Sequence, residues 1–414
     1  MHIGMVYGEP RGYPPDVRVD KELRALAPDG HRVTLLARRV GDRPAREVLL
    51  GGAVTVVREP VTRQAAWRRA AAQARLIAPE WLAPLERFVA RERPDALHVH
   101  DLLLVPTALR VAEGHGIPVV ADLHENMPAA LRAYRHGAPP ATRLKAALWF
   151  PYPLLRWHEA RALARCARVI VVVPEAAERL LAGGLPAERI VVVSNTEEPS
   201  FCPDPPDPPD PPAGEPWIVT YVGGVGPHRG LGTVLAALPR AVARIPGLRL
   251  GVIGATPDQQ GEILATARAL GVEASVQVLG WQPFDRVAEH IAASAACLVP
   301  HEDFEHTQTT VPHKLFQYML CARPVVVSDC RPLARIVGET GAGLIFRAGD
   351  PADLARQLAA LHADPAAAAQ MGARGRAAAL GPYAWHHDAE RLRALYRDLA
   401  AAPTPHAPPE LAPA

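Results

Sequence analysis

The sequence has few aromatic residues, few cysteines and no long apolar run. Phe, Trp and Tyr make up 5% of its 414 residues, and its five cysteines are scattered without a Cys-x-x-Cys pair. That usage predicts reduced structural thiols instead of a disulfide framework. No apolar run approaches the roughly 20 residues that span a bilayer, and MHIGMVYGEP lacks the pattern of a signal peptide. We therefore expect a cytoplasmic protein.

An excess of charge of one sign is also missing. The 45 Lys and Arg residues nearly balance 43 Asp and Glu residues, for a formal net charge of +2. A nucleic-acid-binding domain is usually clearly basic, so no nucleic-acid partner is expected. The only lysines are Lys21, Lys145 and Lys314. In a chain that prefers Arg, a retained Lys hints at a position that only Lys can fill.

Short apolar runs alternate with Ala-, Leu- and Arg-rich helical stretches along the chain. Seven lie at residues 2–7, 32–37, 53–57, 96–100, 117–123, 168–173 and 189–195. Six more lie at 217–223, 248–254, 275–280, 296–300, 323–329 and 343–346. Such runs are typical of buried parallel strands in βαβ units. The pattern predicts an α/β protein with two doubly wound sheets, which suits its length.

A proline-rich segment at 199–216 separates the two halves, because proline at this density excludes a helix or a central strand. We expect a Rossmann-like N-terminal domain at 1–198 and a second Rossmann-like domain at 217–381. A helix is expected at 382–401, and the Pro- and Ala-rich tail at 402–414 is expected to be disordered.

The first candidate site follows the apolar run that ends at 223. Gly223, Gly224 and Gly226 precede Arg229 and a helix, so backbone N–H groups and a helix N-terminus could meet a phosphate. The alternative is an ordinary glycine-rich turn. The segment lacks the G-x-G-x-x-G pattern with its acidic partner, which disfavours NAD.

The second candidate site is a polar loop followed by a helix that begins near Pro312. Thr309 and Thr310 precede this helix, and Lys314 and Gln317 share one of its faces. Its N-terminus would also face an anion at the carboxyl edge of the sheet. The alternatives are a solvated lysine and a surface amide.

In the first domain, Asp122, His124 and Glu125 end a predicted strand at the edge where α/β sheets bind ligands. His124 could donate a hydrogen bond, and Glu125 could take the proton of an acceptor hydroxyl. The alternative is a structural polar pair. His98 and His100 share one strand face, but no further ligands follow at a diagnostic spacing, so no metal is expected.

Several further residues occupy predicted strand ends. Arg11 and Gly12 follow the first strand, and with Asp101 they are expected on the acceptor side. Gly254 and Trp281 follow strands of the second domain, where a nucleotide base could bind, although Trp281 could equally be a core residue.

Together, these segments resemble glycosyltransferase family 4 of the GT-B fold. The resemblance covers about residues 1–400 and includes LHVHDLLLVPTALRVAEGHGIPVVADLHENMP at 97–128 and VPHKLFQYMLCARPVVV at 311–327. It implies two Rossmann-like domains facing a central cleft, with a C-terminal helix around Trp385 that crosses back to the first domain. It also implies retaining transfer of a hexosyl-type sugar from a nucleotide diphosphate sugar to a hydroxyl acceptor, with His124, Glu125, Arg229 and Lys314 as catalytic groups.

The sequence departs from the family pattern at one motif. The family's Glu-x₇-Glu pair falls at Thr309 and Gln317, so neither glutamate is present. One alternative function is therefore a donor-binding homologue without turnover, and another is an epimerase or phosphorylase of the same fold. No Asp-x-Asp metal motif occurs, so Arg229 and Lys314 are expected to stabilise the leaving diphosphate without a metal or other cofactor.

The stretch at 141–168 mixes basic and aromatic residues. Packing of a helix between domains and peripheral contact with anionic lipid are the two interpretations.

Overall fold

The structure is a computed structural model, and it describes residues 1–14, 16–62, 65, 71–72, 76–149, 151–206 and 216–401. The chain forms two compact units. The first consists of 1–128, 139–193 and the chain from Asp388, and the second of 129–138 and 194–387. Part of the predicted linker and the whole predicted tail lie outside the described residues.

The first unit is built on an eight-stranded sheet in the order β3-β4-β2-β1-β5-β6-β7-β8. Its strands are β1 (His2–Tyr7), β2 (Arg32–Arg38), β3 (Arg46–Leu49), β4 (Val54–Glu59), β5 (Ala96–His100), β6 (Val119–Leu123), β7 (Arg168–Val171) and β8 (Ile190–Val192). All neighbouring pairs are parallel except β3–β4. Every residue of β5 and β6 is buried, including His98, His100 and Asp122, as expected for central strands that are covered on both faces.

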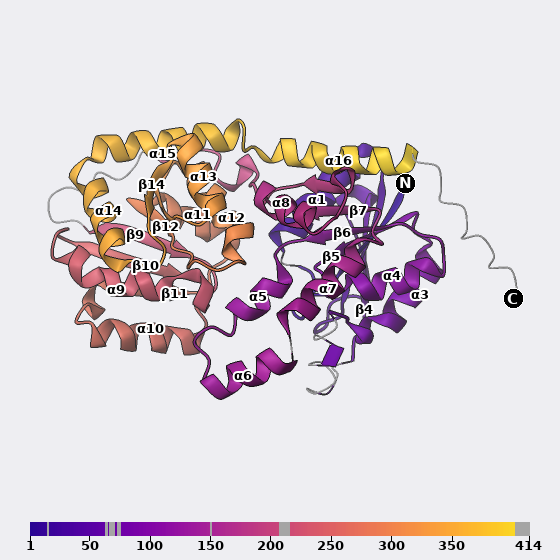
Figure 1. Cartoon of the computed structure of the whole chain (residues 1–414). Coiled ribbons are helices and arrows are strands. Elements are labelled where there is room, and N and C mark those ends of the chain that lie inside the picture. Colours follow the sequence, from indigo (N-terminus) through magenta and orange to yellow (C-terminus); the bar gives the residue numbers. More distant parts are fainter. Residues whose placement is uncertain are drawn as a thin grey trace, which may run out of the picture. The chain divides into compact units, whose positions relative to one another are not determined.

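Helices connect the strands of this sheet (Figure 1). They are α1 (Val17–Leu26), α3 (Leu82–Glu92), α4 (Val105–Glu113), α5 (Met127–Ala133), α6 (Pro140–Trp149), α7 (Tyr152–Leu163) and α8 (Pro174–Ala182). From Ala129 onward, α5 belongs to the second unit. The side chain of Asp16 caps α1 by accepting a hydrogen bond from the Val19 N–H. In the sheet, β1 lies between β2 and β5, so the order of the strands reverses at β1. Such sheets bind ligands beside this point, and the carboxyl ends of β1, β5 and β6 therefore form the edge expected to bind a ligand.

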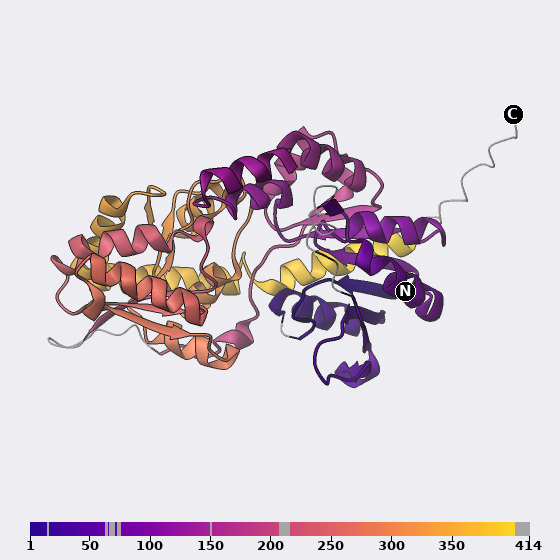
Figure 2. The same ribbon diagram turned by 90° about the horizontal axis from the view of Figure 1, so that it is seen from below.

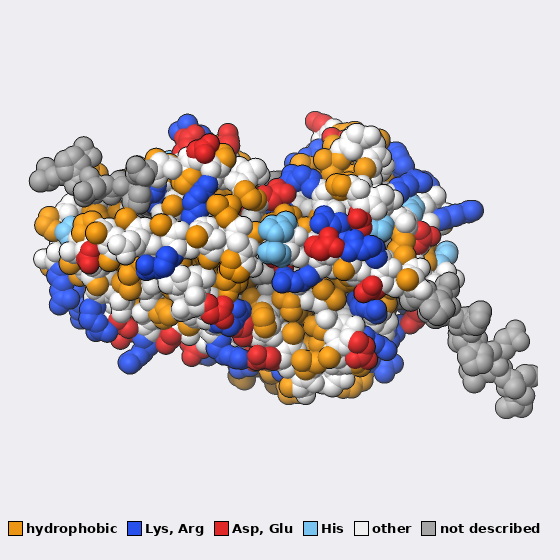
Figure 3. All heavy atoms as spheres, turned by 90° about the horizontal axis from the view of Figure 1, so that it is seen from above, with side chains coloured by type: hydrophobic (Ala, Val, Ile, Leu, Met, Phe, Trp, Pro, Cys, Tyr) orange, Lys and Arg blue, Asp and Glu red, His pale blue; other side chains and the backbone are white. Residues whose placement is uncertain are grey.

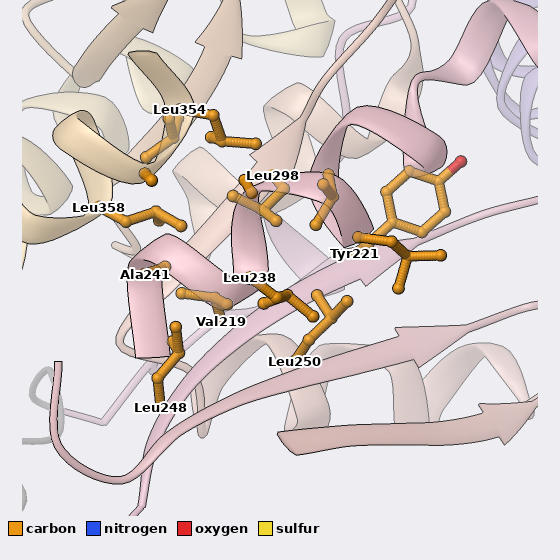
Figure 4. Packing of buried hydrophobic residues seen from close by; sticks show 14 of the residues in the cluster. Val219, Tyr221, Leu238, Ala241, Leu248, Leu250, Leu298, Leu354 and Leu358 are labelled. Atoms are coloured by element: carbon orange, nitrogen blue, oxygen red, sulfur yellow. The ribbon is translucent and has the colours of Figure 1, made fainter. Parts of the chain in front are cut away.

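The second unit contains a six-stranded parallel sheet in the order β11-β10-β9-β12-β13-β14. The strands are β9 (Trp217–Val222), β10 (Leu248–Ile253), β11 (Val276–Gly280), β12 (Ala296–Val299), β13 (Val325–Ser328) and β14 (Gly343–Phe346). Its core includes Val219, Leu250 and Leu298 from the sheet, with Leu238 and Leu358 from helices (Figure 4).

The helices of this unit are α9 (Leu231–Val242), α10 (Pro257–Ala269), α11 (Phe284–Ala292), α12 (His313–Leu320), α13 (Arg331–Thr340), α14 (Pro351–Ala363) and α15 (Pro365–Leu380). The last helix, α16 (Trp385–Ala401), belongs from Asp388 onward to the first unit (Figure 2). Its Tyr396 hydroxyl lies 2.7 Å from Nδ1 of His98 on β5. The predicted return of the C-terminal helix to the first domain is confirmed.

Every strand predicted from an apolar run is present, and the two-sheet α/β fold is confirmed. The prediction omitted β3, a short antiparallel edge strand with two exposed residues. On the face drawn in Figure 3, basic and acidic side chains are interspersed, in keeping with the balanced composition. No helix within the described residues is long and apolar enough to cross a membrane.

Candidate functional site

The glycine-rich turn after β9 closes tightly against neighbouring strand ends. Gly230, just before α9, has φ +71°, and a Cβ there would lie 1.6 Å from the carbonyl oxygen of Pro300. Gly254, just after β10, has φ +100°, and a Cβ there would lie 3.1 Å from the carbonyl carbon of Gly223. Only glycine fits at these two positions, because the backbones touch and φ is positive. Gly224 and Gly226 lie in the same turn, whose backbone could approach a ligand closely.

Two cations converge on this turn. A Cβ on Gly223 would lie 3.2 Å from Nζ of Lys314 and 3.6 Å from Nη1 of Arg229. Nζ of Lys314 also lies 3.9 Å from the centre of the Tyr221 ring, a cation–π contact. In Figure 4 that ring lies at the edge of the core with its hydroxyl directed away from it. Lys314 and Arg229, each predicted to stabilise the leaving diphosphate, therefore lie at the same turn.

Neither cation has a negative partner in the part of the chain that the structure describes. Lys314 is 5% exposed, and within the described chain its Nζ has no hydrogen-bond partner. Neither Lys314 nor Arg229 forms an ion pair with any described residue. Burial, and then the charge of Arg229, hold the pKa of Lys314 well below its usual value. A buried ammonium without a partner is costly, so binding of an anion would relieve the cost.

Local packing explains how Lys314 reaches the turn. Helix α12 begins at His313, with Pro312 as its N-cap, one residue later than the predicted first helical position. Its Tyr318 hydroxyl accepts a hydrogen bond from the Val222 N–H at 2.8 Å, which ties α12 to the end of β9. Lys314 lies one turn before Tyr318, and this places its side chain over Gly223.

Buried histidines surround the cations, and the sequence patterns did not single them out. The ring centres of His228 and His306 are 5.2 Å apart, and those of His228 and His301 are 6.5 Å apart. Burial, and then the charge of Arg229, lower the pKa of His228 to about 3 and that of His306 to about 4. These rings are therefore neutral near pH 7, and they add polar atoms without adding charge. The only signal in the sequence was that His301 follows Pro300 at a strand end.

The remaining residues predicted for the second domain differ in their surroundings. The hydroxyl of Thr309 donates to the carbonyl oxygens of Glu305 and His306 at 3.0 and 3.2 Å. Thr309 therefore completes a local turn, and Thr310 beside it is also buried. Trp281 is 72% exposed just after β11, so the core interpretation of this residue is wrong. Gln317 is buried, so the surface-amide interpretation is also wrong.

In the first unit, His124 lies between two carboxylates at the end of β6. Its Nε2 is 2.9 Å from Oδ2 of Asp122, and its Nδ1 is 3.5 Å from Oδ1 of Asp101. Burial acts to lower its pKa, but the charges of Asp101 and Asp122 outweigh burial and raise the pKa of His124 to about 10. His124 is thus a cation that donates hydrogen bonds and cannot act as a base near neutral pH.

Asp101 has a left-handed backbone with φ +66°, which is uncommon for a residue other than glycine and occurs often at functional sites. Glu125, next to His124, is partly exposed. Arg11 is exposed, and Gly12 is buried and donates its N–H to the Glu9 carbonyl oxygen at 2.9 Å.

Behind His124 lies a fully buried network of charges. Arg18 donates to both carboxylate oxygens of Asp122, at 2.7 and 3.0 Å, and lies 3.0 Å from Glu22. Nε2 of His98 is 3.2 Å from Glu22, and Nδ1 of His100 is 3.0 Å from Asp122. Burial opposes protonation, but hydrogen bonds to Asp122 and Glu22 raise the pKa of His98 to about 9.

This network contains four potential metal ligands. Single ligand atoms of Glu22, His98, His100 and Asp122 lie within 4.8 Å of one another. The positive charges of Arg18 and protonated His98 balance the two carboxylates, however. The group is therefore electrically neutral by itself, which is the expected condition for buried charges.

Models of two protein families match the two halves of the chain. The model of Glycosyltransferase Family 4 matches residues 17–196, and that of Glycosyl transferases group 1 matches residues 216–364. D-inositol 3-phosphate glycosyltransferase of Segniliparus rotundus is 29% identical over 184 residues, which are 44% of this chain and 39% of that protein. The chain thus matches about two fifths of the length of several such curated relatives.

Solved structures share the fold. Sucrose-phosphate synthase from Thermosynechococcus elongatus has a TM-score of 0.79 at 20% identity, over 97% of this chain and all of that chain. An Anabaena protein, HepE, solved in complex with UDP, has a TM-score of 0.68 at 15% identity over the same shares. The family models match both Rossmann-like units, and the structural neighbours extend over nearly the whole chain. The chain belongs to glycosyltransferase family 4 and has the GT-B fold.

Proposed function

We propose that this protein transfers a hexosyl-type sugar from a nucleotide diphosphate sugar to a hydroxyl acceptor, with retention at the anomeric carbon. The observation that carries the proposal is the buried Lys314 beside the half-buried Arg229 at the glycine turn of the second unit, where neither cation forms an ion pair with a described residue. Relatives with glycosyltransferase names and neighbours solved with UDP or a UDP-sugar support a donor of this class.

In the proposed reaction, the bond between the anomeric carbon and the diphosphate oxygen breaks, and the diphosphate leaves with the electron pair. A new bond forms from the acceptor oxygen to the same carbon, and the acceptor loses its proton. Lys314 and Arg229 stabilise the charge that grows on the diphosphate. The imidazolium of His124 donates a hydrogen bond to the sugar or acceptor, and Glu125 orients the acceptor hydroxyl or takes its proton.

The direct test of the donor site is calorimetry with UDP on the wild type and on Arg229→Ala. A hydrogen bond to a charged group contributes roughly 1.5–3 kcal/mol, so we expect affinity to fall by about ten- to a hundredfold. Unchanged affinity would move the diphosphate away from the turn around Gly223.

Turnover assays separate the proposal from its alternatives. A transferase needs both donor and acceptor, whereas an epimerase converts the donor alone. A non-catalytic homologue would bind the donor without turnover. Thr309 favours this last alternative. The family motif has a carboxylate at this position, whereas the Thr309 hydroxyl donates its hydrogen bonds to backbone carbonyl oxygens.

We also propose that no metal is needed, because two cations are already placed at the turn. Turnover is expected to survive EDTA. Complete loss of turnover in EDTA, restored by Mg²⁺ or Mn²⁺, would contradict this part of the proposal.

Peripheral contact with anionic lipid is proposed for helices α6 and α7. Leu144, Leu148 and Trp157 are among the most exposed large apolar side chains, and Arg143 and Arg161 are exposed on the same helices. Amphipathic basic surfaces bind anionic membranes. Co-sedimentation with phosphatidylglycerol vesicles should exceed that with phosphatidylcholine vesicles and should fall on Leu144→Gln/Leu148→Gln. Equal recovery with both lipids would contradict the proposal.

A further inference from the structure

The segment that follows β8 carries a buried carboxylate that no sequence motif predicted. Glu197 is 3% exposed, and its Oε2 accepts a hydrogen bond from Nε2 of Gln317 at 2.8 Å. Nearby, the side chain of Asn195 donates to the carbonyl oxygen of Val311 at 2.8 Å. This second bond holds the segment against the residues that lead into α12. These two hydrogen bonds therefore hold Glu197 and its segment against α12 and the residues before it.

The contact with Glu197 determines which way the amide of Gln317 faces. A carboxylate accepts hydrogen bonds, so the NH₂ group of Gln317 must turn toward it and the amide oxygen must turn away. Within the described chain, Oε1 of Gln317 has no hydrogen-bond partner. Lys314 lies three residues earlier on the same face of α12. The amide oxygen of Gln317 is therefore an oriented acceptor, and it lies about one turn along α12 from Lys314.

We propose that Glu197 is a positioning residue of the donor site: it holds the amide of Gln317, already expected to be a donor-site residue, so that Oε1 is free to accept a hydrogen bond from a hydroxyl of the donor. The inference rests on the proposed function, since it names a further contact in the same donor site. In this pair, Glu197 on the segment after β8 supplies the carboxylate and Gln317 on α12 supplies the amide.

An exchange of the two side chains tests the pair. Calorimetry with UDP and with UDP-glucose would compare the wild type with Gln317→Glu, Glu197→Gln and the double exchange. Gln317→Glu places two carboxylates in contact, and we expect affinity to fall by about tenfold or more. Glu197→Gln no longer fixes the amide, and a loss of about threefold to tenfold is expected. The double exchange restores a carboxylate–amide pair and should return to within about threefold of the wild type.

The comparison of UDP with UDP-glucose shows which part of the donor carries the hydroxyl that Gln317 contacts. Equal losses for UDP and UDP-glucose would place it on the nucleoside, and a loss confined to UDP-glucose would place it on the sugar; either result supports the pair. Gln370→Glu, an exposed change on α15, is the matched control and should bind like the wild type. The pair is overturned if folded single variants bind like the wild type, or if the double exchange binds no better than the weaker single variant. A wild type that binds no nucleotide sugar would instead contradict the proposed function.

Discussion

Each unit buries charged side chains at the carboxyl edge of its sheet, but the two groups are built differently. In the first unit, Arg18 pairs with Asp122 and Glu22, and the charges balance. In the second unit, Lys314 and Arg229 lie together without a carboxylate partner among the described residues. The charges of the first group offset one another, whereas the buried cation of the second group would be stabilised by binding an anion. From this difference we expect a structural network in the first unit and a binding site in the second.

The largest expected effect is on the paired group. Arg18→Ala leaves two buried carboxylates without their main counter-ion, and breaking a buried pair in this way costs about 3–5 kcal/mol. Urea unfolding should show this loss in the free energy of unfolding. Arg249→Ala, an exposed change on β10, is the control and should shift it by less than about 0.5 kcal/mol. A loss under about 1 kcal/mol for Arg18→Ala would show that the network is not a structural unit.

A second comparison concerns which unit contributes to turnover and which unit binds the diphosphate. His124→Ala and Glu125→Gln should each lower turnover by about 10²-fold, the range of one acid–base contribution. Their affinity for UDP should stay near that of the wild type, because the diphosphate is assigned to the second unit. Kinetics and calorimetry on the same preparations give both values. Loss of UDP binding by a folded variant would reverse the assigned roles.

A third comparison concerns pH, whose effects have opposite signs in the two units. The pKa of His124 is raised from 6.5 to about 10. Its contribution to stability is therefore complete below pH 6.5 and is lost as the pH rises toward 10. The pKa of His306 is lowered from 6.5 to about 4 by burial and by Arg229. As the pH falls, His306 is protonated in the unfolded chain before it is protonated in the folded chain. The folded state therefore loses stability as the pH falls from 6.5 toward 4.

Melting temperatures between about pH 4 and pH 10 would check these signs. His124→Gln should flatten the alkaline side of the wild-type curve, and His306→Gln should flatten the acidic side. An unchanged alkaline slope in His124→Gln would show that its carboxylate neighbours do not stabilise the imidazolium.

Local patterns predicted most of the fold. Buried parallel strands leave apolar runs that are visible without any knowledge of their partners, and both sheets were predicted from such runs. Strand β3 was missed because an edge strand with two exposed positions and a contact on one side needs no such run. The start of α12 was displaced by one residue because Pro312 is the N-cap and not the first helical residue.

The candidate site was only partly predictable, for the same reason. Gly223, Arg229 and Lys314 stand in motifs from which their roles could be predicted locally. Glu197 and Gln317 are 120 residues apart in sequence, and only the folded chain shows that they form a pair. The neutral state of the buried His306 likewise follows from burial beside Arg229, which no local pattern encodes.

The central claim is that Lys314 is a buried cation kept for a ligand and not for the fold. The most direct measurement compares Lys314→Ala with the wild type in both donor turnover and urea unfolding. We expect kcat/KM for the donor to fall by about 10²-fold, as for loss of one transition-state donor, with partial recovery in Lys314→Arg. The free energy of unfolding should stay the same or rise, because a buried charge without a partner has been removed. A fully active Lys314→Ala enzyme, or one destabilised as strongly as Arg18→Ala, would contradict the claim.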